Sequence, residues 1–112
     1  MASTADFAPD FSVVVPVFNE ADNVRPLWDR LLPVLTQTGG RFEVVFVDDG
    51  SRDGTFAAVK QLHARDQRVR GISLSSNFGH QIALLAGLRQ ASGRIVITMD
   101  GDLQHPPELI PS

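Results

Sequence analysis

The sequence predicts an α/β fold in which a parallel β-sheet carries helices on both of its faces. Short runs rich in β-branched residues alternate along the chain with segments whose apolar residues recur at helical spacing. Glycine, aspartate and serine separate the two kinds of segment, as expected for turns. The chain has 112 residues, of which 43% are hydrophobic, and this is enough for one domain with a substantial core.

The first predicted unit is a strand over residues 11–17, FSVVVPV, followed by a helix. The helix is expected to end at Gly39 and Gly40. Its apolar residues recur at helical spacing: Val24, Leu27, Trp28, Leu31, Leu32 and Leu35. Pro26 suits a first helical turn, whereas Pro33 is expected to kink this helix or end it early.

The second predicted unit is a strand over residues 42–47, FEVVFV, and a helix from Thr55 to about Arg65. The apolar face of this helix is expected to be buried: Phe56, Val59 and Leu62.

The third predicted unit is a strand over residues 69–74, VRGISL, and a helix from about Gly79 to Gln90. Ser92 and Gly93 are expected to stop this helix. This helix is expected to place Ile82, Leu85 and Ala86 on one face.

A fourth predicted strand, RIVITM over residues 94–99, completes three consecutive strand–helix–strand units. Such units are right-handed and place their strands in parallel. Residues 1–10 are expected to form a disordered N-terminal tail before the domain begins at Phe11.

The composition excludes several classes of function. A formal net charge of -3 gives no basic footprint, so no nucleic-acid partner is expected. The absence of cysteine excludes disulfides, thiolate metal sites and a cysteine nucleophile, and it fits a reducing compartment such as the cytoplasm. The N-terminus lacks the features of a signal peptide. The longest nearly apolar run, FSVVVPVF, is far shorter than the ~20 residues that a membrane helix needs.

Polar and acidic residues follow all four predicted strands. The segments are PVFNE, DDGSRDG, SSNFGH and DGDLQH, in chain order. In open α/β sheets, ligands bind beyond the carboxyl ends of the strands. The sequence therefore predicts one ligand site at that edge, built from four loops.

The loop after the fourth strand has the pattern of a metal site. Side chains two residues apart in extended backbone point the same way, so Asp100 and Asp102 can reach one ion across Gly101. Gln104 can add an oxygen if the chain stays extended. Carboxylates without cysteine favour a hard cation, Mg²⁺ or Mn²⁺. A solvated Asp-Gly turn explains this motif equally well when it is taken alone.

The loop after the second strand allows two interpretations. Asp49 can accept a hydrogen bond from N3–H of uracil or from the N–H groups of guanine, which favours UDP or GDP as a ligand. Asp53 or Thr55 can instead simply cap the following helix. Phosphorylated receiver domains have a similar acidic pair, but they also need a lysine after a later strand. The only lysine here, Lys60, lies inside a predicted helix.

The loop after the first strand contains Pro16, Phe18 and Glu20. Phe18 can lie against a base or a ribose, or it can pack in the core. Glu20 can bond ribose hydroxyls or cap the following helix. Asn77 and Gly79 stand at the start of the third helix, where free N–H groups favour anions.

Together, VVVPVFNEADNV, VDDGSRDGT, SSNFGHQIALLAGL and MDGDLQHPPELI resemble the family 2 glycosyltransferases with a GT-A fold. The closer resemblance is to the polyprenyl-phosphate and dolichyl-phosphate sugar transferases. The match covers nearly the whole chain from Phe11 onward. It implies that residues 11–112 are the N-terminal, Rossmann-like, nucleotide-sugar-binding part of a longer domain.

The resemblance also implies roles for individual residues. The nucleotide pocket would be lined by Pro16, Phe18, Glu20, Val47 and Asp49. The diphosphate and the metal would be met by Met99, Asp100, Gly101 and Asp102. The cation, Mg²⁺ or Mn²⁺, would be held by Asp100, Asp102 and Gln104, with the two aspartates as the catalytic residues. Phe18 stands where a tyrosine is often found, and it keeps the ring but not the hydroxyl.

The activity that the resemblance implies is metal-assisted, inverting transfer of a sugar from a UDP- or GDP-sugar to a polyprenyl or dolichyl phosphate. In a longer parent protein this acceptor would lie at the cytoplasmic face of a membrane. The acceptor phosphate is already ionised near neutral pH, since its second pKa is about 6, so no general base is expected. Polysaccharide synthesis and nucleotide binding without turnover are the alternatives. An exposed sheet edge is also expected to favour self-association.

Overall fold

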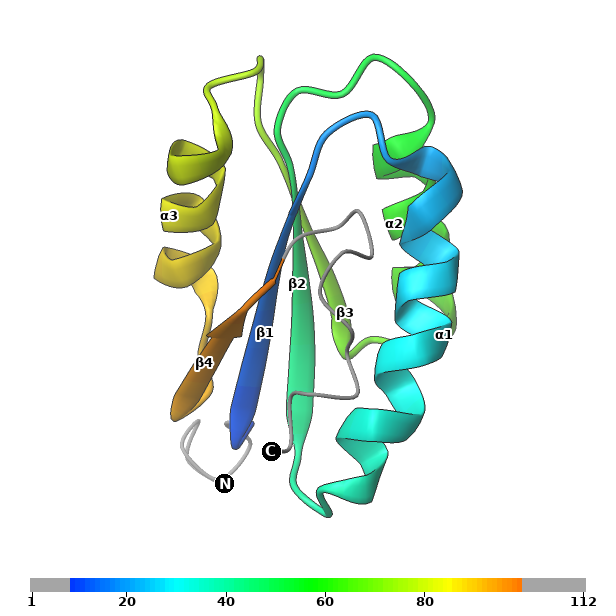
Figure 1. The fold of residues 1–112 in the computed structure, drawn as a ribbon, viewed down its shortest axis with the longest axis vertical. Helices are drawn as coiled ribbons and strands as arrows, with labels where there is room; N and C mark the ends of the chain where they lie inside the picture. The colour runs from blue at the N-terminus through cyan, green and yellow to red at the C-terminus, as the bar shows by residue number, and fades with distance from the viewer. Residues whose placement is uncertain (1–8, 100–112) are drawn as a thin grey trace, which may run out of the picture.

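The computed structural model describes residues 9–99, which form four strands and three helices in alternating order (Figure 1). The strands are β1 (Phe11–Val17), β2 (Phe42–Asp48), β3 (Val69–Ser73) and β4 (Ile95–Thr98). The helices are α1 (Ala21–Gln37), α2 (Thr55–Arg65) and α3 (His80–Gln90). All strand pairs are parallel, and the order in the sheet is β3-β2-β1-β4. The predicted α/β class is confirmed.

The sheet has a helical layer on each face, with α1 and α2 on one side and α3 on the other (Figure 1). The strand side chains alternate between these layers. The larger core lies under α1 and α2 and includes Val13, Val15, Leu27, Leu31, Val44, Phe46, Val59 and Leu62. The smaller core lies under α3 and includes Val14, Val45, Val47 and Ala83. The central strands β1 and β2 are therefore covered on both faces.

Two prolines of α1 behave differently from the prediction. The helix continues past Pro33 to Gln37, so it does not end early at that proline. Pro26 lies in the second turn and not in the first, because the helix begins at Ala21. Both prolines are exposed, so water can donate hydrogen bonds to the carbonyl groups for which proline supplies no N–H.

The apolar face predicted for α3 is partly buried only at Ala86, which packs against the smaller core. Ile82 and Leu85 are 50% and 47% exposed, whereas Ala83 and Gly87 are buried. A Cβ atom on Gly87 would lie 2.3 Å from Cγ1 of Val14, so the helix approaches the sheet through its small residues. The face of α3 with small residues therefore packs against the sheet, and Ile82 and Leu85 remain exposed to solvent. No helix within residues 9–99 is long and apolar enough to span a membrane.

Candidate functional site

The loops after β1, β2 and β3 meet at the carboxyl edge of the sheet, as the sequence predicted (Figure 1). They enclose an open hollow of about 590 Å³. Its lining residues are Phe18, Asn19, Asp48, Gly50, Ser51, Arg52, Ser73, Leu74, Ser75, Ser76 and Asn77. The loop that follows β4 lies outside the described residues.

Asn19 joins the first two loops. Its N–H donates to Ser51 Oγ over 2.8 Å, and its Oδ1 accepts from the Arg52 N–H over 3.0 Å. Its φ of 52° is left-handed, a conformation that asparagine tolerates better than most residues. The loop after β1 is therefore fixed against the loop after β2.

Asp53 and Thr55 join the starts of α1 and α2. Asp53 Oδ1 accepts from the Thr55 N–H (2.9 Å) and from the Thr55 hydroxyl, and Asp53 Oδ2 accepts from the Ala21 N–H (3.3 Å). The Thr55 hydroxyl oxygen accepts from the Glu20 N–H over 2.9 Å. The hydrogen bond from the Thr55 hydroxyl is the main cause that lowers the pKa of Asp53 below its ordinary value. Asp53 thus bonds the first N–H groups of both helices, although the N-cap position of α2 is occupied by Gly54 and not by Asp53 or Thr55.

The two aspartates at the end of β2 have different partners. Asp49 is 4% exposed, and its two oxygens accept from the N–H groups of Phe78 (2.8 Å) and Gly79 (3.0 Å). Asp48 lines the hollow, and its Oδ1 accepts from the Ser51 N–H over 3.0 Å. An ionised carboxylate offers about four acceptor positions, so each aspartate keeps capacity for a ligand N–H or O–H.

Gly50 brings the second and third loops into direct contact. Its φ is +72°, and a Cβ atom there would lie 2.3 Å from the carbonyl carbon of Ser76 and 2.4 Å from the nitrogen of Asn77. Both neighbours are backbone atoms, which cannot move aside cheaply. A glycine is therefore required for the close approach of these loops.

The residues predicted for the nucleotide pocket lie in different environments. Phe18 is 42% exposed and lines the hollow. Glu20 is half-buried, and its Oε2 accepts from Asn23 Nδ2 over 2.6 Å. The side chains of Pro16 and Val47 are buried. Of the predicted pocket residues, only Phe18 is among those that line the hollow, and Pro16, Glu20, Val47 and Asp49 are not.

The residues predicted for the metal and the diphosphate fall mostly beyond the described part of the chain. Met99 is buried, and its N–H donates to the Val14 carbonyl oxygen over 3.1 Å. The other predicted residues, Asp100, Gly101, Asp102 and Gln104, lie outside the described residues. Within residues 9–99, no group of three or more His, Cys, Asp or Glu side chains is arranged to hold a metal ion.

The hollow is richer in hydroxyl groups than the sequence motifs suggested. Four serines line it, Ser51, Ser73, Ser75 and Ser76, together with the Arg52 side chain. The signal that could have identified them is their position, since Ser73 ends β3 and the other three lie within three residues of the end of β2 or β3. The arrangement suits a polar ligand that both donates and accepts hydrogen bonds.

Comparison with known proteins gives a consistent result. The sequence model of the family described as Glycosyl transferase family 2 matches residues 12–112. An uncharacterized glycosyltransferase of Bacillus subtilis, YkcC, is 44% identical over 100 residues, which are 89% of this chain and 31% of that protein. The dodecaprenyl-phosphate galacturonate synthase of Rhizobium johnstonii is 41% identical over 104 residues, which are 92% of this chain and 31% of that protein. The chain thus spans about a third of the length of these relatives.

Solved structures of similar fold carry nucleotides. TarS of S. aureus in complex with UDP-GlcNAc superimposes with a TM-score of 0.65 and 32% identity, covering 83% of this chain and 26% of that one. The mannosyltransferase PcManGT from Pyrobaculum calidifontis, in complex with GDP-Man and Mn²⁺, gives a TM-score of 0.64 and 32% identity, covering 85% and 28%.

Proposed function

The chain belongs to glycosyl transferase family 2, and from this membership we propose that it forms the donor-binding part of a sugar transferase. The donor is a UDP- or GDP-sugar, and the acceptor is a polyprenyl phosphate at a membrane surface. The observation that carries the proposal is the polar hollow at the carboxyl edge of the sheet, built by three interlocked loops. The acceptor class is supported by relatives named for transfer to dodecaprenyl and undecaprenyl phosphate.

In this proposal the nucleotide lies in the hollow. The half-exposed ring of Phe18 stacks on the base or the ribose. The Asp49 carboxylate, oriented by two backbone N–H groups, accepts a hydrogen bond from the base. Glu20 bonds the ribose hydroxyls. Pro16 and Val47 act through the backbone, because their side chains are buried under the strand ends.

The diphosphate lies at the end of β4, beside Met99 and Gly101. The oxygen donors of Asp100, Asp102 and Gln104 would hold Mg²⁺ or Mn²⁺, since a cysteine-free set of oxygen ligands fits a hard cation. Such a cation would stabilise the negative charge that develops on the leaving nucleoside diphosphate. The structure supports this placement, because the Met99 N–H keeps the chain alongside β1 up to the residue before Asp100.

The chemistry of the transfer is a single displacement with inversion. An ionised oxygen of the acceptor phosphate forms a bond to the anomeric carbon. The bond from that carbon to the diphosphate oxygen breaks, and the electron pair leaves with the nucleoside diphosphate. The acceptor needs no general base from this chain, because its second pKa is about 6.

The proposal is tested by calorimetric titration of the chain with UDP and with GDP, each in Mn²⁺ and in EDTA. We expect one nucleotide to bind in a metal-dependent manner and Asp102→Ala to weaken that binding about tenfold or more. Asp66→Asn is the matched control, because Asp66 is an acid at the opposite edge of the sheet. No binding of either nucleotide to the folded chain would overturn the proposal.

A further inference from the structure

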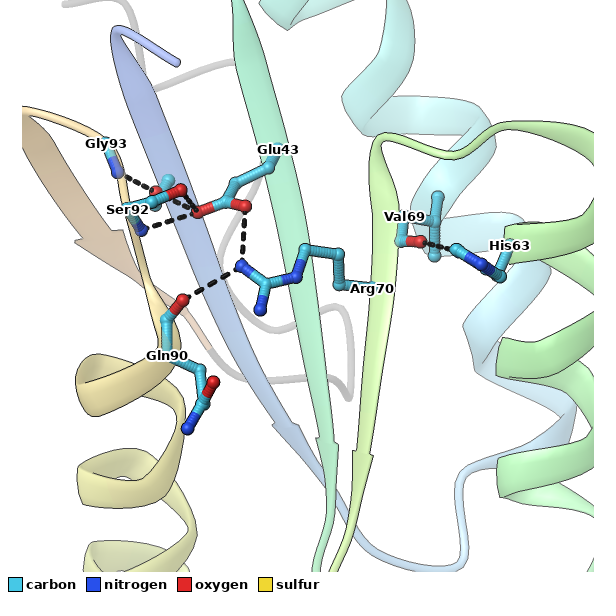
Figure 2. A network of polar contacts seen from close by, with 8 residues as sticks. Glu43, His63, Val69, Arg70, Gln90, Ser92 and Gly93 are labelled. Carbon is cyan, nitrogen blue, oxygen red and sulfur yellow. Dashed lines mark hydrogen bonds and ion pairs between the residues drawn. The ribbon is translucent and has the colours of Figure 1, made fainter. Parts of the chain in front are cut away.

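A second polar cluster lies at the amino edge of the sheet, on the face that α3 covers (Figure 2). Its centre is Glu43 of β2, whose side chain is only 8% exposed. Glu43 Oε2 accepts from the Ser12 hydroxyl (2.6 Å), the Ser92 N–H (2.8 Å) and the Ser92 hydroxyl (3.0 Å). Glu43 Oε1 accepts from Arg70 Nη1 over 2.9 Å. None of these residues has a role in the proposed nucleotide site.

These contacts converge on the turn between α3 and β4. The Ser12 hydroxyl oxygen accepts from the Gly93 N–H over 2.7 Å, and Arg70 Nη1 also donates to the Gln90 carbonyl oxygen over 2.8 Å (Figure 2). Three neighbouring strands thus contribute one side chain each, from Ser12, Glu43 and Arg70. All three side chains hold residues 90–93.

The turn has no room to move toward the sheet. A Cβ atom on Gly93 would lie 2.6 Å from Ser12 Oγ and 2.7 Å from the carbonyl carbon of Phe11. The turn therefore rests directly on the backbone of β1, and the Glu43 cluster holds it there from the side.

The strand that follows this turn is weakly held by other contacts. β4 has four residues and, within residues 9–99, pairs with β1 alone. Ile95 and Val96 are 54% and 39% exposed, so burial contributes little at the start of the strand, and the apolar contacts that hold this segment come from Ile97 and from Met99 just after it. A slip by one residue would move the strand by about 3.3 Å along its axis and turn its side chains to the opposite face.

We propose that Glu43 is a positioning residue that fixes the start of β4, and through it the position of Met99, the last described residue of the chain, at the carboxyl edge. An extended strand is stiff, so an offset at Gly93 is carried over five residues, about 17 Å, to the end of the strand at Thr98. That a displaced β4 would weaken the metal site rests on the proposed function. That Glu43 fixes the position of β4 does not.

The charge of Glu43 is part of this role. Burial alone would raise the pKa of Glu43, but the hydrogen bonds from Ser12, Ser92 and Arg70 together lower it below the ordinary value. The group is therefore an ionised carboxylate at neutral pH, and it can accept hydrogen bonds but cannot donate them. The amide of Glu43→Gln would turn an N–H₂ donor toward other donors, so this nearly isosteric change should release the turn.

The first test is amide hydrogen exchange of the wild type and Glu43→Gln. We expect the amides of Ile95 and Met99, which donate to the carbonyl oxygens of Asp10 and Val14, to exchange about tenfold faster in the variant. The Leu74 amide, bonded to the Asp48 carbonyl oxygen, should change by less than about twofold. Asp66→Asn is the matched control, since Asp66 is an arginine-paired acid whose partner is Arg68. Equal acceleration at all three amides, or none, would overturn the proposal.

The second test links β4 to the metal. Nucleotide affinity is measured in Mn²⁺ and in EDTA. Glu43→Gln should lower the affinity in Mn²⁺ about tenfold and leave the affinity in EDTA unchanged, so that the ratio of the first to the second falls about tenfold. An unchanged ratio, with β4 exchange accelerated, would overturn the link to the metal site. If the wild type binds no nucleotide, the proposed function fails and hydrogen exchange still decides the role of Glu43. Ser12→Ala, which removes one bridge to Gly93, provides a milder variant should Glu43→Gln not fold.

Discussion

The two edges of the sheet hold carboxylates of the same strand in contrasting settings. Glu43 lies near the start of β2, and Asp48 and Asp49 lie at and just after its end. Glu43 is surrounded by side-chain and turn donors from the rest of the domain, and they use its oxygens within a closed cluster. Asp48 and Asp49 are held by backbone N–H groups of loops that enclose an open hollow. A hollow of about 450 Å³ also borders Glu43, so the two edges differ less in open space than in how fully the carboxylate oxygens are already bonded within the fold.

The largest loss of stability should come from removing the Glu43 carboxylate from its cluster of donors. Glu43→Ala leaves the Arg70 guanidinium and the Ser92 N–H without their acceptor, and we expect a loss of about 3 kcal/mol in the free energy of unfolding. Urea unfolding measures it. Asp66→Ala, which breaks a more exposed arginine pair, should cost less than about 1 kcal/mol. Equal losses in the two variants would show that the Glu43 cluster stabilises the fold no more than a more exposed ion pair does.

At the carboxyl edge the largest effect should come from the contact between the second and third loops. Gly50→Ala should cost about 2 kcal/mol or more, because a left-handed φ and a backbone clash act together. Gly39→Ala is the matched control, since Gly39 has a φ of +75° with no atom within 4 Å of its virtual Cβ. It should cost about 1 kcal/mol. Identical thermal unfolding of the two variants would show that the loops do not touch as described.

A smaller effect should follow from Asp49→Asn. The amide keeps one acceptor, so one of the two hydrogen bonds from the Phe78 and Gly79 N–H groups is lost. We expect a loss of about 1 kcal/mol in stability and weaker nucleotide binding. Normal stability together with normal binding would exclude Asp49 from both roles.

The smallest effect should be a change in how the free energy of unfolding depends on pH in the acid range. Hydrogen bonds from Ser12, Ser92 and Arg70 hold the pKa of Glu43 below its ordinary value in the folded chain, so the unfolded chain takes up this proton first as the pH falls. The contribution of Glu43 to stability is therefore complete above about pH 4.5 and is lost as the pH falls through the folded pKa. Glu43→Gln should flatten the decline of stability in this range. An unchanged slope in urea titrations at several pH values would contradict the assignment.

Local features of the fold could be predicted from the sequence. The strand over residues 11–17 and the helix Thr55–Arg65 occur at the predicted residues, because β-branched runs and helical spacing are properties of neighbouring residues. The part of α3 that packs most deeply was not predicted, because the apolar pattern pointed to Ile82 and Leu85, whereas Ala83 and Gly87 are the buried residues. The depth to which a helix packs depends on its partner surface, which the helix sequence does not contain.

Long-range hydrogen bonds account for most of what could not be predicted about the site. The donors to Asp49 lie 29 and 30 residues further along the chain, so its buried pairing leaves no local pattern. Glu43 is one acid in an apolar strand, and its partners Ser12 and Ser92 are 31 and 49 residues away. The convergence of loops at the carboxyl edge could be predicted, because it follows from parallel topology alone.

The central claim is that the carboxyl edge, and not the amino edge, binds the nucleotide. Amide NMR shifts during titration with UDP and with GDP, in the presence of Mg²⁺, test it most directly. We expect one nucleotide to shift the amides of residues 17–20, 48–52 and 74–79 and to leave residues 41–43 and 90–93 unchanged. Shifts centred on the Glu43 cluster, or no shifts with either nucleotide, would contradict the account.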